Sequence, residues 1–209
     1  MKSLPHALRI AGAALTGITL AACSSSPTAP AGTKRLSAAV GAPLKTCAGL
    51  TQAFRFDQTT VDAVSTVPAG EMKQGTQPVA EHCLVKGAMH KRKGSDGRDY
   101  AIGFEMRLPK AWNGRFYYQG NGGLDGSVKT ADGALGGGPL TGALMQGFAV
   151  ISSDAGHSGP QTPYFGAEAQ SRLDYGYQAV SKLTPMAKAL IATAYGKGPD
   201  RSYLGGCSN

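Results

Sequence analysis

The 209-residue sequence has no apolar run long enough to cross a bilayer, for which about 20 residues are needed. Its apolar stretch Ile10–Ala22 is too short, and it follows a basic start that carries Lys2 and Arg9. A basic start followed by a short apolar run is typical of a secretory signal peptide. The chain is therefore expected to be exported rather than to span a membrane.

The sequence lacks the signals of nucleic-acid binding and of a nucleotide-binding P-loop. The dense basic cluster is His90–Lys93, in a chain of formal net charge +8, and no aromatic residues interleave with it to stack on bases. Because Gly94-Ser-Asp-Gly97 follows, this cluster is predicted to be a solvated hairpin tip, and no nucleic-acid partner is expected. The glycine-rich loop Gly120–Gly126 lacks a following Gly-Lys-Ser/Thr, which excludes a phosphate-binding P-loop.

The signal peptide ends in a motif with a second meaning. Leu20-Ala-Ala-Cys23 resembles the lipobox of bacterial lipoproteins, in which the cysteine is acylated and becomes the new N-terminus. The alternative is an ordinary signal peptide cut nearby, with Cys23 as a free thiol. The lipobox interpretation predicts a lipid-anchored protein at the outer membrane or facing the periplasm. It divides the chain into a signal peptide (1–22), a flexible Ser/Pro/Ala tether (23–40) and a folded portion (41–209).

Cysteine is scarce, with four in the whole chain. If Cys23 carries lipid, Cys47, Cys83 and Cys207 remain, and disulfides persist in the compartments that receive exported proteins. Three is an odd number, so one thiol lacks a partner within this chain. Composition and spacing leave the pairing open at this point.

Periodicity predicts strands that alternate with helices, which indicates a parallel α/β sheet. The second helix has Thr184 as its N-cap, Pro185 at its first position and Gly196 just after its end. Its apolar face is predicted to contain Met186, Ala189, Leu190 and Ala194. The expected strands are 100–108, 115–119, 147–152 and 201–204, and the expected helices are 173–183 and 185–195.

The last residues indicate chemistry. Gly206-x-Ser208 follows a predicted strand and matches the first half of a G-x-S-x-G nucleophile elbow, where the serine needs small neighbours on a sharp turn. Taken alone, a Gly-x-Ser string is common. In such sites one oxyanion-hole amide follows the nucleophile and another comes from a loop after an early strand. Asn209 and Gly122, with Gly123 beside it, are the candidates; the alternative for the loop is a plain flexible connection.

An ordered set of segments resembles the tannase and feruloyl esterase family, which includes hydrolases of mono(hydroxyethyl) terephthalate. The resemblance covers about residues 43–209 and implies an α/β-hydrolase fold, here its N-terminal portion up to the elbow, without the lid and the C-terminal part. The segments are Trp112–Phe116 leading to Gly122-Gly123, Ser153-Asp154-x-Gly156-His157, Asp174–Tyr177, Thr184 with Ala187–Ile191, Tyr195-Gly196, Pro199, and Ser202–Ser208.

The resemblance assigns roles residue by residue. Ser208 becomes the nucleophile of a Ser-His-Asp triad whose Asp and His follow it in sequence, so neither is within this chain. Cys207 is expected to pair with a cysteine beyond Asn209, which leaves Cys47 to pair with Cys83. No organic cofactor is implied, although family members often carry structural calcium in a lid inserted after the elbow. The implied substrates are small esters of aromatic acids.

The remaining histidines and acids receive lesser roles. His82, His90 and His157 all precede Ser208, so none is expected to be the catalytic base. Asp154 and His157 resemble a structural pair that shapes the loop after the third strand. Asp125 either organises the glycine loop or is an ordinary turn carboxylate.

Two other functions compete with the esterase hypothesis. A chain that ends one residue after its nucleophile is expected to be nearly inactive, so it could be a pseudoenzyme or a non-catalytic surface lipoprotein that binds cell-surface polymers. The basic excess and the lipobox fit that alternative, but it does not account for the glycine loop and the Gly206-Cys207-Ser208 elbow. An α/β-hydrolase of another family, such as a polyester depolymerase, is disfavoured by the cysteine next to Ser208.

Overall fold

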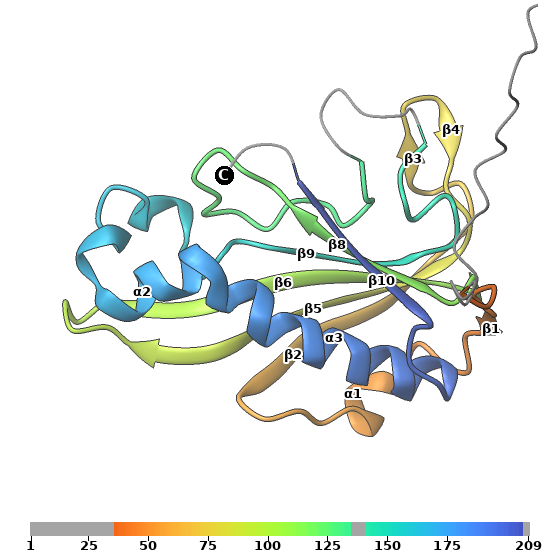
Figure 1. Cartoon of the computed structure of the whole chain (residues 1–209), viewed down its shortest axis with the longest axis horizontal. Coiled ribbons are helices and arrows are strands. Elements are labelled where there is room, and N and C mark those ends of the chain that lie inside the picture. Colours follow the sequence, from red (N-terminus) through yellow and green to blue (C-terminus); the bar gives the residue numbers. More distant parts are fainter. Residues whose placement is uncertain (1–35, 135–140, 207–209) are drawn as a thin grey trace, which may run out of the picture. The chain divides into compact units, whose positions relative to one another are not determined.

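A six-stranded mixed β-sheet organises the chain from Ser37 onward, with the strand order β10-β8-β9-β6-β5-β2 (Figure 1). The computed structural model describes residues 36–134 and 141–206. The strands of the sheet are β2 (Thr59–Val67), β5 (His82–Lys93), β6 (Asp99–Pro109), β8 (Arg115–Gly120), β9 (Ala149–Ser153) and β10 (Arg201–Gly206).

The sheet is parallel only between β9, β8 and β10, so the parallel α/β sheet expected from the sequence is wrong for the other strands. From β9 the sheet continues through β6, β5 and β2 with antiparallel pairing. The physical reason is the length of the connections. Residues 94–98 alone join β5 to β6, and a short turn can join only antiparallel strands, whereas parallel strands need long crossovers such as those that follow β8 and β9.

Helix α3 (Ala179–Tyr195) covers one face of the sheet (Figure 1). Met186, Leu190 and Ala194 are fully buried against the strands, as the apolar pattern predicts, while Ala189 is partly buried. Gly196 ends the helix in a left-handed conformation (φ 82°), a backbone geometry that glycine adopts without steric cost.

The predicted N-cap at Thr184 is wrong, because α3 begins at Ala179 and passes through Thr184 and Pro185. Ala179 and Leu183 are buried in the same core as the rest of the helix, so packing extends the helix by more than one turn before the proline. Pro185 itself is exposed, where its ring meets solvent instead of the sheet.

In place of the single helix expected over residues 173–183, the structure has the end of α2, the π-helical turn η3 and the start of α3, which follow one another without a break. The 3₁₀ turns η1 and η2 precede α2. Their bounds are η1 (Gly159–Gln161), η2 (Phe165–Ala167), α2 (Ala169–Leu173) and η3 (Asp174–Gln178).

The connection from β8 to β9 covers the other face of the sheet. Ala131, Ala143 and Leu144 from this connection form a second apolar cluster with Val79 and with Val150 of β9. All five residues of β9 are buried, which confirms that this apolar strand is covered on both faces.

A buried polar network attaches that connection to the sheet. Arg107 Nε donates to Glu105 Oε1 (2.7 Å), and the same oxygen accepts the Ala131 amide (3.1 Å). His82 Nδ1 lies 2.8 Å from the Ala80 carbonyl oxygen, and its Nε2 lies 2.7 Å from Arg107 Nη1. Burial lowers the pKa of His82, which fits a neutral imidazole that donates to Ala80 and accepts from Arg107.

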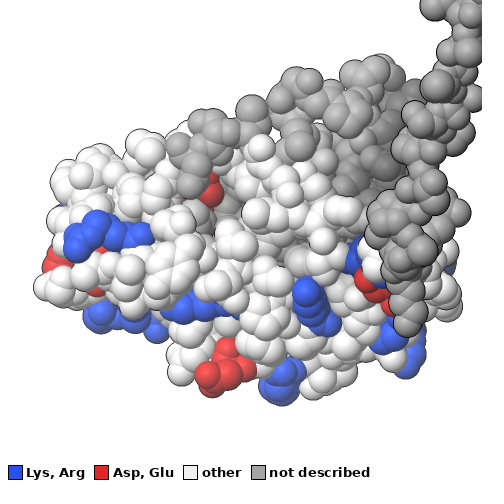
Figure 2. All heavy atoms as spheres, in the orientation of Figure 1, with Lys and Arg blue, Asp and Glu red and all other residues white. Residues whose placement is uncertain are grey.

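The basic cluster lies on the predicted hairpin, but one of its members is not solvated. Lys91 and Lys93 have side chains that are 54% and 69% exposed, whereas the Arg92 side chain is 21% exposed and pairs with acidic residues. Because successive side chains of a strand point to opposite faces of the sheet, the Arg92 side chain lies on the face opposite to those of Lys91 and Lys93. On the face shown in Figure 2, lysine and arginine side chains lie singly or in small groups among uncharged residues.

The segment before β2 is attached to the rest of the fold by a disulfide and by a hydrogen bond from a backbone amide. A disulfide joins Cys47 to Cys83, the pair that the family resemblance implies, and its Cα atoms are 5.5 Å apart. Val40 also contacts the folded unit, because its amide donates to Asp200 Oδ2 at 2.7 Å.

No helix in the described part of the chain is long and apolar enough for a membrane crossing. The small elements are β1 (Ala42–Pro43), α1 (Leu50–Ala53), β3 (Lys73–Gln74), β4 (Gln77–Pro78) and β7 (Ala111–Trp112).

Replacing Cys47 and Cys83 together with alanine is expected to lower the free energy of unfolding by about 2–4 kcal/mol, because their separation of 36 residues makes the open loop costly to close. Urea denaturation of the oxidised protein measures the loss. Dithiothreitol should remove the difference in stability between the wild type and the double variant. Equal stability of the oxidised wild type and the variant would contradict the prediction.

Candidate active site

The three parallel strands end around one cavity of about 190 Å³, here called the strand-end cavity. Ligands of open α/β sheets bind outside the carboxyl ends of parallel strands. The residues that line this cavity come from the ends of β8, β9 and β10, from the glycine loop, and from η3 and α3. They are Tyr118, Gly120, Asn121, Asp125, Ser153, Ala155, Tyr175, Gly176, Ala179, Val180, Leu204, Gly205 and Gly206.

The ends of β8 and β10 approach each other through glycine. Gly120 and Gly206 are paired in register, and a Cβ added to Gly206 would lie 3.1–3.3 Å from backbone atoms of Gly120. Glycine at the end of β10 therefore keeps the two strands close where the chain leaves the sheet. Cys207, Ser208 and Asn209 follow directly, but they lie outside the described residues, as does Cys23.

The glycine loop has an unusual backbone. Five consecutive residues, Gly122 to Gly126, have positive φ values between 39° and 80°, and two of them, Leu124 and Asp125, are not glycine. Residues other than glycine are uncommon at positive φ, and this conformation strains their backbone. The Asp125 amide donates to the Gly122 carbonyl oxygen (3.1 Å), and the Gly126 amide donates to the Asp154 carbonyl oxygen (3.0 Å). The loop is thus a defined turn fixed to the end of β9.

The Asp125 carboxyl lies within this turn. Burial raises its pKa, and the nearby Gly122 backbone opposes that shift. Asp125 Oδ1 is buried and has no hydrogen-bond partner among the described residues. Gly120 and Asn121 line the strand-end cavity directly, and Gly122 comes one residue later.

Two amide side chains that the sequence analysis missed hold the loop in place. Asn121 Nδ2 donates to Ser152 Oγ (3.0 Å) and to the Ser153 carbonyl oxygen (2.7 Å). Gln119 Oε1 accepts the Gly133 amide (2.8 Å), and its Nε2 donates to Asn121 Oδ1 (3.0 Å). The available signal was their position at the end of a strand, directly before the glycines.

Two buried hydroxyls lie beneath the cavity. Tyr118 Oη and Ser153 Oγ are 3.0 Å apart on the neighbouring strands β8 and β9. Burial raises the pKa of Tyr118, which keeps its hydroxyl protonated at neutral pH. This hydrogen-bonded, uncharged pair therefore forms part of the lining of the cavity.

Asp154 fixes the loop that follows β9. Its Oδ1 accepts the Gly103 amide (3.0 Å) and the Gly156 amide (2.9 Å). Burial outweighs these bonds and raises its pKa to about 7. Its carboxyl also lines a second cavity of about 420 Å³ beside the β5–β6 hairpin. Asp154 therefore has the loop-holding geometry that the family resemblance implies for it.

His157 is enclosed by aromatic rings. It is 1% exposed, it stacks on Phe165 with ring centroids 3.9 Å apart, and the Tyr175 ring packs edge-on at 5.8 Å. Burial lowers its pKa, and the nearby Leu124 backbone opposes this only in part. Neither ring nitrogen has a hydrogen bond of normal geometry to the described residues. A neutral, enclosed imidazole fits packing of the loop better than proton transfer.

A metal site is not formed by the residues that the structure describes. They include no group of three or more His, Cys, Asp or Glu side chains placed to hold a metal ion. The family resemblance places its calcium in a lid inserted after the elbow, and no chemistry of this site is assigned to it.

Comparisons with known proteins match the chain to ester hydrolases. A family model described as tannase and feruloyl esterase matches residues 83–209. Mono(2-hydroxyethyl) terephthalate hydrolase of Piscinibacter sakaiensis is 39% identical over 158 residues, which cover 72% of this chain and 26% of that protein. Feruloyl esterase B of Aspergillus niger is 36% identical over 104 residues, which cover 50% of this chain and 19% of that protein.

A solved structure supports the same relationship. The crystal structure of feruloyl esterase B from Aspergillus oryzae matches with a TM-score of 0.62 at 28% identity, over 77% of this chain and 31% of that chain. The described residues thus form part of an α/β-hydrolase fold. This chain spans about a third or less of the length of the relatives named here.

The stability of the protein is expected to depend on pH through Asp154. Because its pKa is raised to about 7 from an ordinary value of 3.8, the folded state holds a proton that the unfolded state releases, and this contribution to stability is lost as pH rises from about 4 to 7. Asp154→Asn keeps an oxygen acceptor without the charge. It should flatten that decline, with a gain above pH 7 of up to about 4 kcal/mol.

Urea denaturation at several pH values measures the difference between wild type and variant. Asp99→Asn, which removes an exposed carboxylate from the neighbouring strand β6, is the matched control. Parallel stability curves for the wild type and Asp154→Asn would show that the carboxyl does not titrate as stated.

Proposed function

Because the chain belongs to the tannase and feruloyl esterase family, we propose that the complete protein is a serine carboxylic ester hydrolase that acts on small esters of aromatic acids. One observation carries the proposal: the glycine loop and the Gly205-Gly206 end of β10 meet at the strand-end cavity. Ser208 follows Gly206 by two residues, so a nucleophile on the turn after β10 would start beside this cavity.

The proposed reaction is acyl transfer. Ser208 Oγ attacks the ester carbonyl carbon while a histidine accepts its proton, and an aspartate orients that histidine. The carbonyl oxygen becomes an oxyanion, the C–O bond of the ester then breaks, and the histidine gives the proton to the leaving alcohol. Water repeats the sequence on the acyl-serine and releases the acid. The histidine and aspartate are assigned to sequence beyond Asn209.

The oxyanion would be held by the backbone amides of Gly122 and Asn209. The positive φ of Gly122 and Gly123 supports this role, because a turn without side chains lets amides approach a developing negative charge.

The substrate class rests on family membership and on the lining of the cavity. The named relatives act on terephthalate and feruloyl esters, both esters of aromatic acids, according to their names. The rings of Tyr118 and Tyr175 and the side chains of Val180 and Leu204 line the strand-end cavity. Such a lining suits a flat, largely apolar acyl group. The proposal covers galloyl, feruloyl and terephthaloyl esters alike.

The location of the protein follows from its start. We infer that Cys23 is acylated and becomes the new N-terminus when residues 1–22 are removed, and that it anchors the protein at the outer membrane or facing the periplasm. The Cys47–Cys83 disulfide supports export, since disulfides persist in oxidising compartments. In the same proposal Cys207 pairs with a cysteine beyond Asn209.

Ser208→Ala is expected to reduce hydrolysis of aryl esters by about four orders of magnitude or more, since the nucleophile is lost while binding remains. The assay uses methyl ferulate, methyl gallate and mono(2-hydroxyethyl) terephthalate with the protein expressed from the complete reading frame. Ser202→Ala, an exposed serine on β10, is the matched control. Residues 1–209 alone, without a triad Asp and His, are expected to hydrolyse these esters very little.

An inactive wild type would favour the alternative, a non-catalytic lipoprotein or pseudoenzyme. Activity that survives Ser208→Ala would leave the family assignment intact and overturn the assigned nucleophile.

Cys23→Ser is expected to abolish incorporation of radiolabelled palmitate and to move the protein from the membrane fraction to the soluble fraction, because the acylated sulfur is lost. Ser24→Ala, beside the acylation site, should keep both the label and the membrane association. Labelling that persists in Cys23→Ser would exclude this residue as the anchor.

A further inference from the structure

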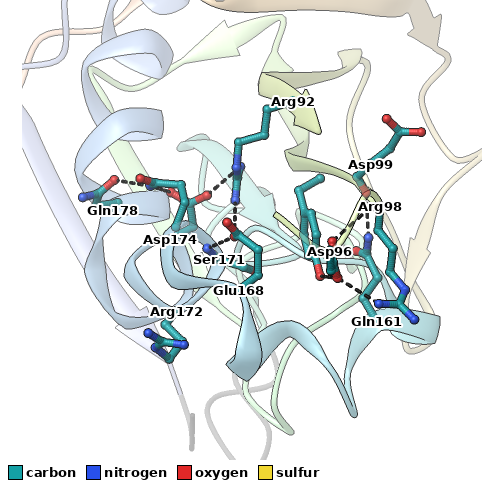
Figure 3. Close-up of polar contacts among 12 residues, drawn as sticks. Arg92, Asp96, Arg98, Asp99, Gln161, Glu168, Ser171, Arg172, Asp174 and Gln178 are labelled. Atoms are coloured by element: carbon teal, nitrogen blue, oxygen red, sulfur yellow. Dashed lines mark hydrogen bonds and ion pairs between the residues drawn. The ribbon is translucent and has the colours of Figure 1, made fainter. Parts of the chain in front are cut away.

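Arg92 joins two parts of the chain that lie far apart in sequence. It extends from the end of β5, and its guanidinium lies between Asp174 of η3 and Glu168, the N-cap of α2 (Figure 3). Nη1 is 2.9 Å from Asp174 Oδ2, and Nη2 is 3.4 Å from Glu168 Oε2. The guanidinium also lies over the Tyr100 ring, 5.4 Å from its centroid. A single side chain thus fastens the β5–β6 hairpin to the helical segment.

The two carboxylates are buried, and each lies close to cationic or polar groups. Asp174 is fully buried, and its Oδ1 accepts from Gln170 Nε2 (3.0 Å) and Lys182 Nζ (3.2 Å). Glu168 accepts the Ser171 amide at 2.5 Å and so caps α2. Two cations, Arg92 and Lys182, therefore balance two carboxylates. Removal of one partner from such a buried set leaves an uncompensated charge, which is costly.

Asp174 lies directly before a wall of the strand-end cavity. It is the first residue of η3, and the next two residues, Tyr175 and Gly176, line that cavity. On its other side the chain packs against Gly156, where an added Cβ would lie 2.5 Å from Asp174 Cβ. π-helical turns are rare and are found frequently at functional sites.

We propose that Arg92 is a positioning residue for the strand-end cavity: through its ion pairs with Asp174 and Glu168 it holds η3 so that Tyr175 and Gly176 form a wall for the bound substrate. The proposal rests on the proposed function insofar as it takes this cavity to bind the ester. Arg92 does not touch the cavity itself, so its effect is on the shape of the wall and not on the reacting atoms.

A charge-matched variant separates positioning from simple charge balance. Arg92→Met alone leaves two carboxylates, Asp174 and Glu168, with Lys182 as the only cation paired to them among the described residues. The double variant Arg92→Met/Glu168→Gln restores the balance, because Asp174 keeps its pair with Lys182 (3.2 Å), but it does not restore the link between the hairpin and η3. Lys93→Met, at the next residue of β5 and with an exposed side chain, is the matched control.

Amide hydrogen exchange reports the position of η3 without any need for activity. Amides of residues 174–178 are expected to exchange about tenfold faster or more in both Arg92 variants, while residues 186–194 of α3 keep their wild-type rates. Lys93→Met should match the wild type throughout. Wild-type exchange at 174–178 in the charge-matched variant would overturn the proposal, since balance alone would then suffice.

Ester hydrolysis by the complete protein gives the second readout. Both Arg92 variants are expected to raise KM for methyl ferulate about tenfold with kcat changed less than about twofold, the pattern of lost binding that is shared by ground and transition states. A wild-type KM in the charge-matched variant would contradict the positioning role. A wild type without esterase activity would instead refute the proposed function, and the exchange rates would still decide the role of Arg92.

Discussion

Burial of β9 on both faces is the constraint on which the rest of the structure depends. All five of its residues are buried, so the fold needs an apolar layer on each side of the sheet. Helix α3 supplies one layer, and the connection from β8 to β9 supplies the other. That connection begins as the glycine loop and ends by feeding into β9 itself. The segment that covers the sheet therefore also frames the cavity, and the site is positioned by the same contacts that form the core.

The sequence predicted the elements whose signals are local. Alternation over 100–108, the apolar run 147–152 and the glycine at 196 correspond to β6, β9 and the end of α3. Strand direction was predicted wrongly, because it depends on which strands meet and on the lengths of their connections. The start of α3 was also wrong, since burial of Leu183 outweighed the capping preference of Thr184. In both cases tertiary packing overrode a local preference.

The residues of the candidate site also differ in whether a local sequence pattern could predict them. Gly122 and Ser208 can be proposed from the sequence because a glycine loop and a Gly-x-Ser string are recognisable in it. The residues that hold the site together, Asn121 and Arg92 among them, are single polar residues without a pattern. Arg92 was hidden by its neighbours: a basic run suggests solvent, although strand alternation must turn every second residue to the other face. Buried charges of this kind become visible only when their partners, distant in sequence, are brought to them.

The disulfide has a consequence for the order in which the protein matures. Cys47 and Cys83 are successive cysteines, and Cys207 comes more than a hundred residues later. In the proposed export from the N-terminus, with Cys23 acylated, Cys47 and Cys83 reach the oxidising compartment before Cys207 emerges. Their bond can therefore close before Cys207 is available. Under that proposal the order of emergence alone separates this pair from Cys207, without any difference in thiol reactivity.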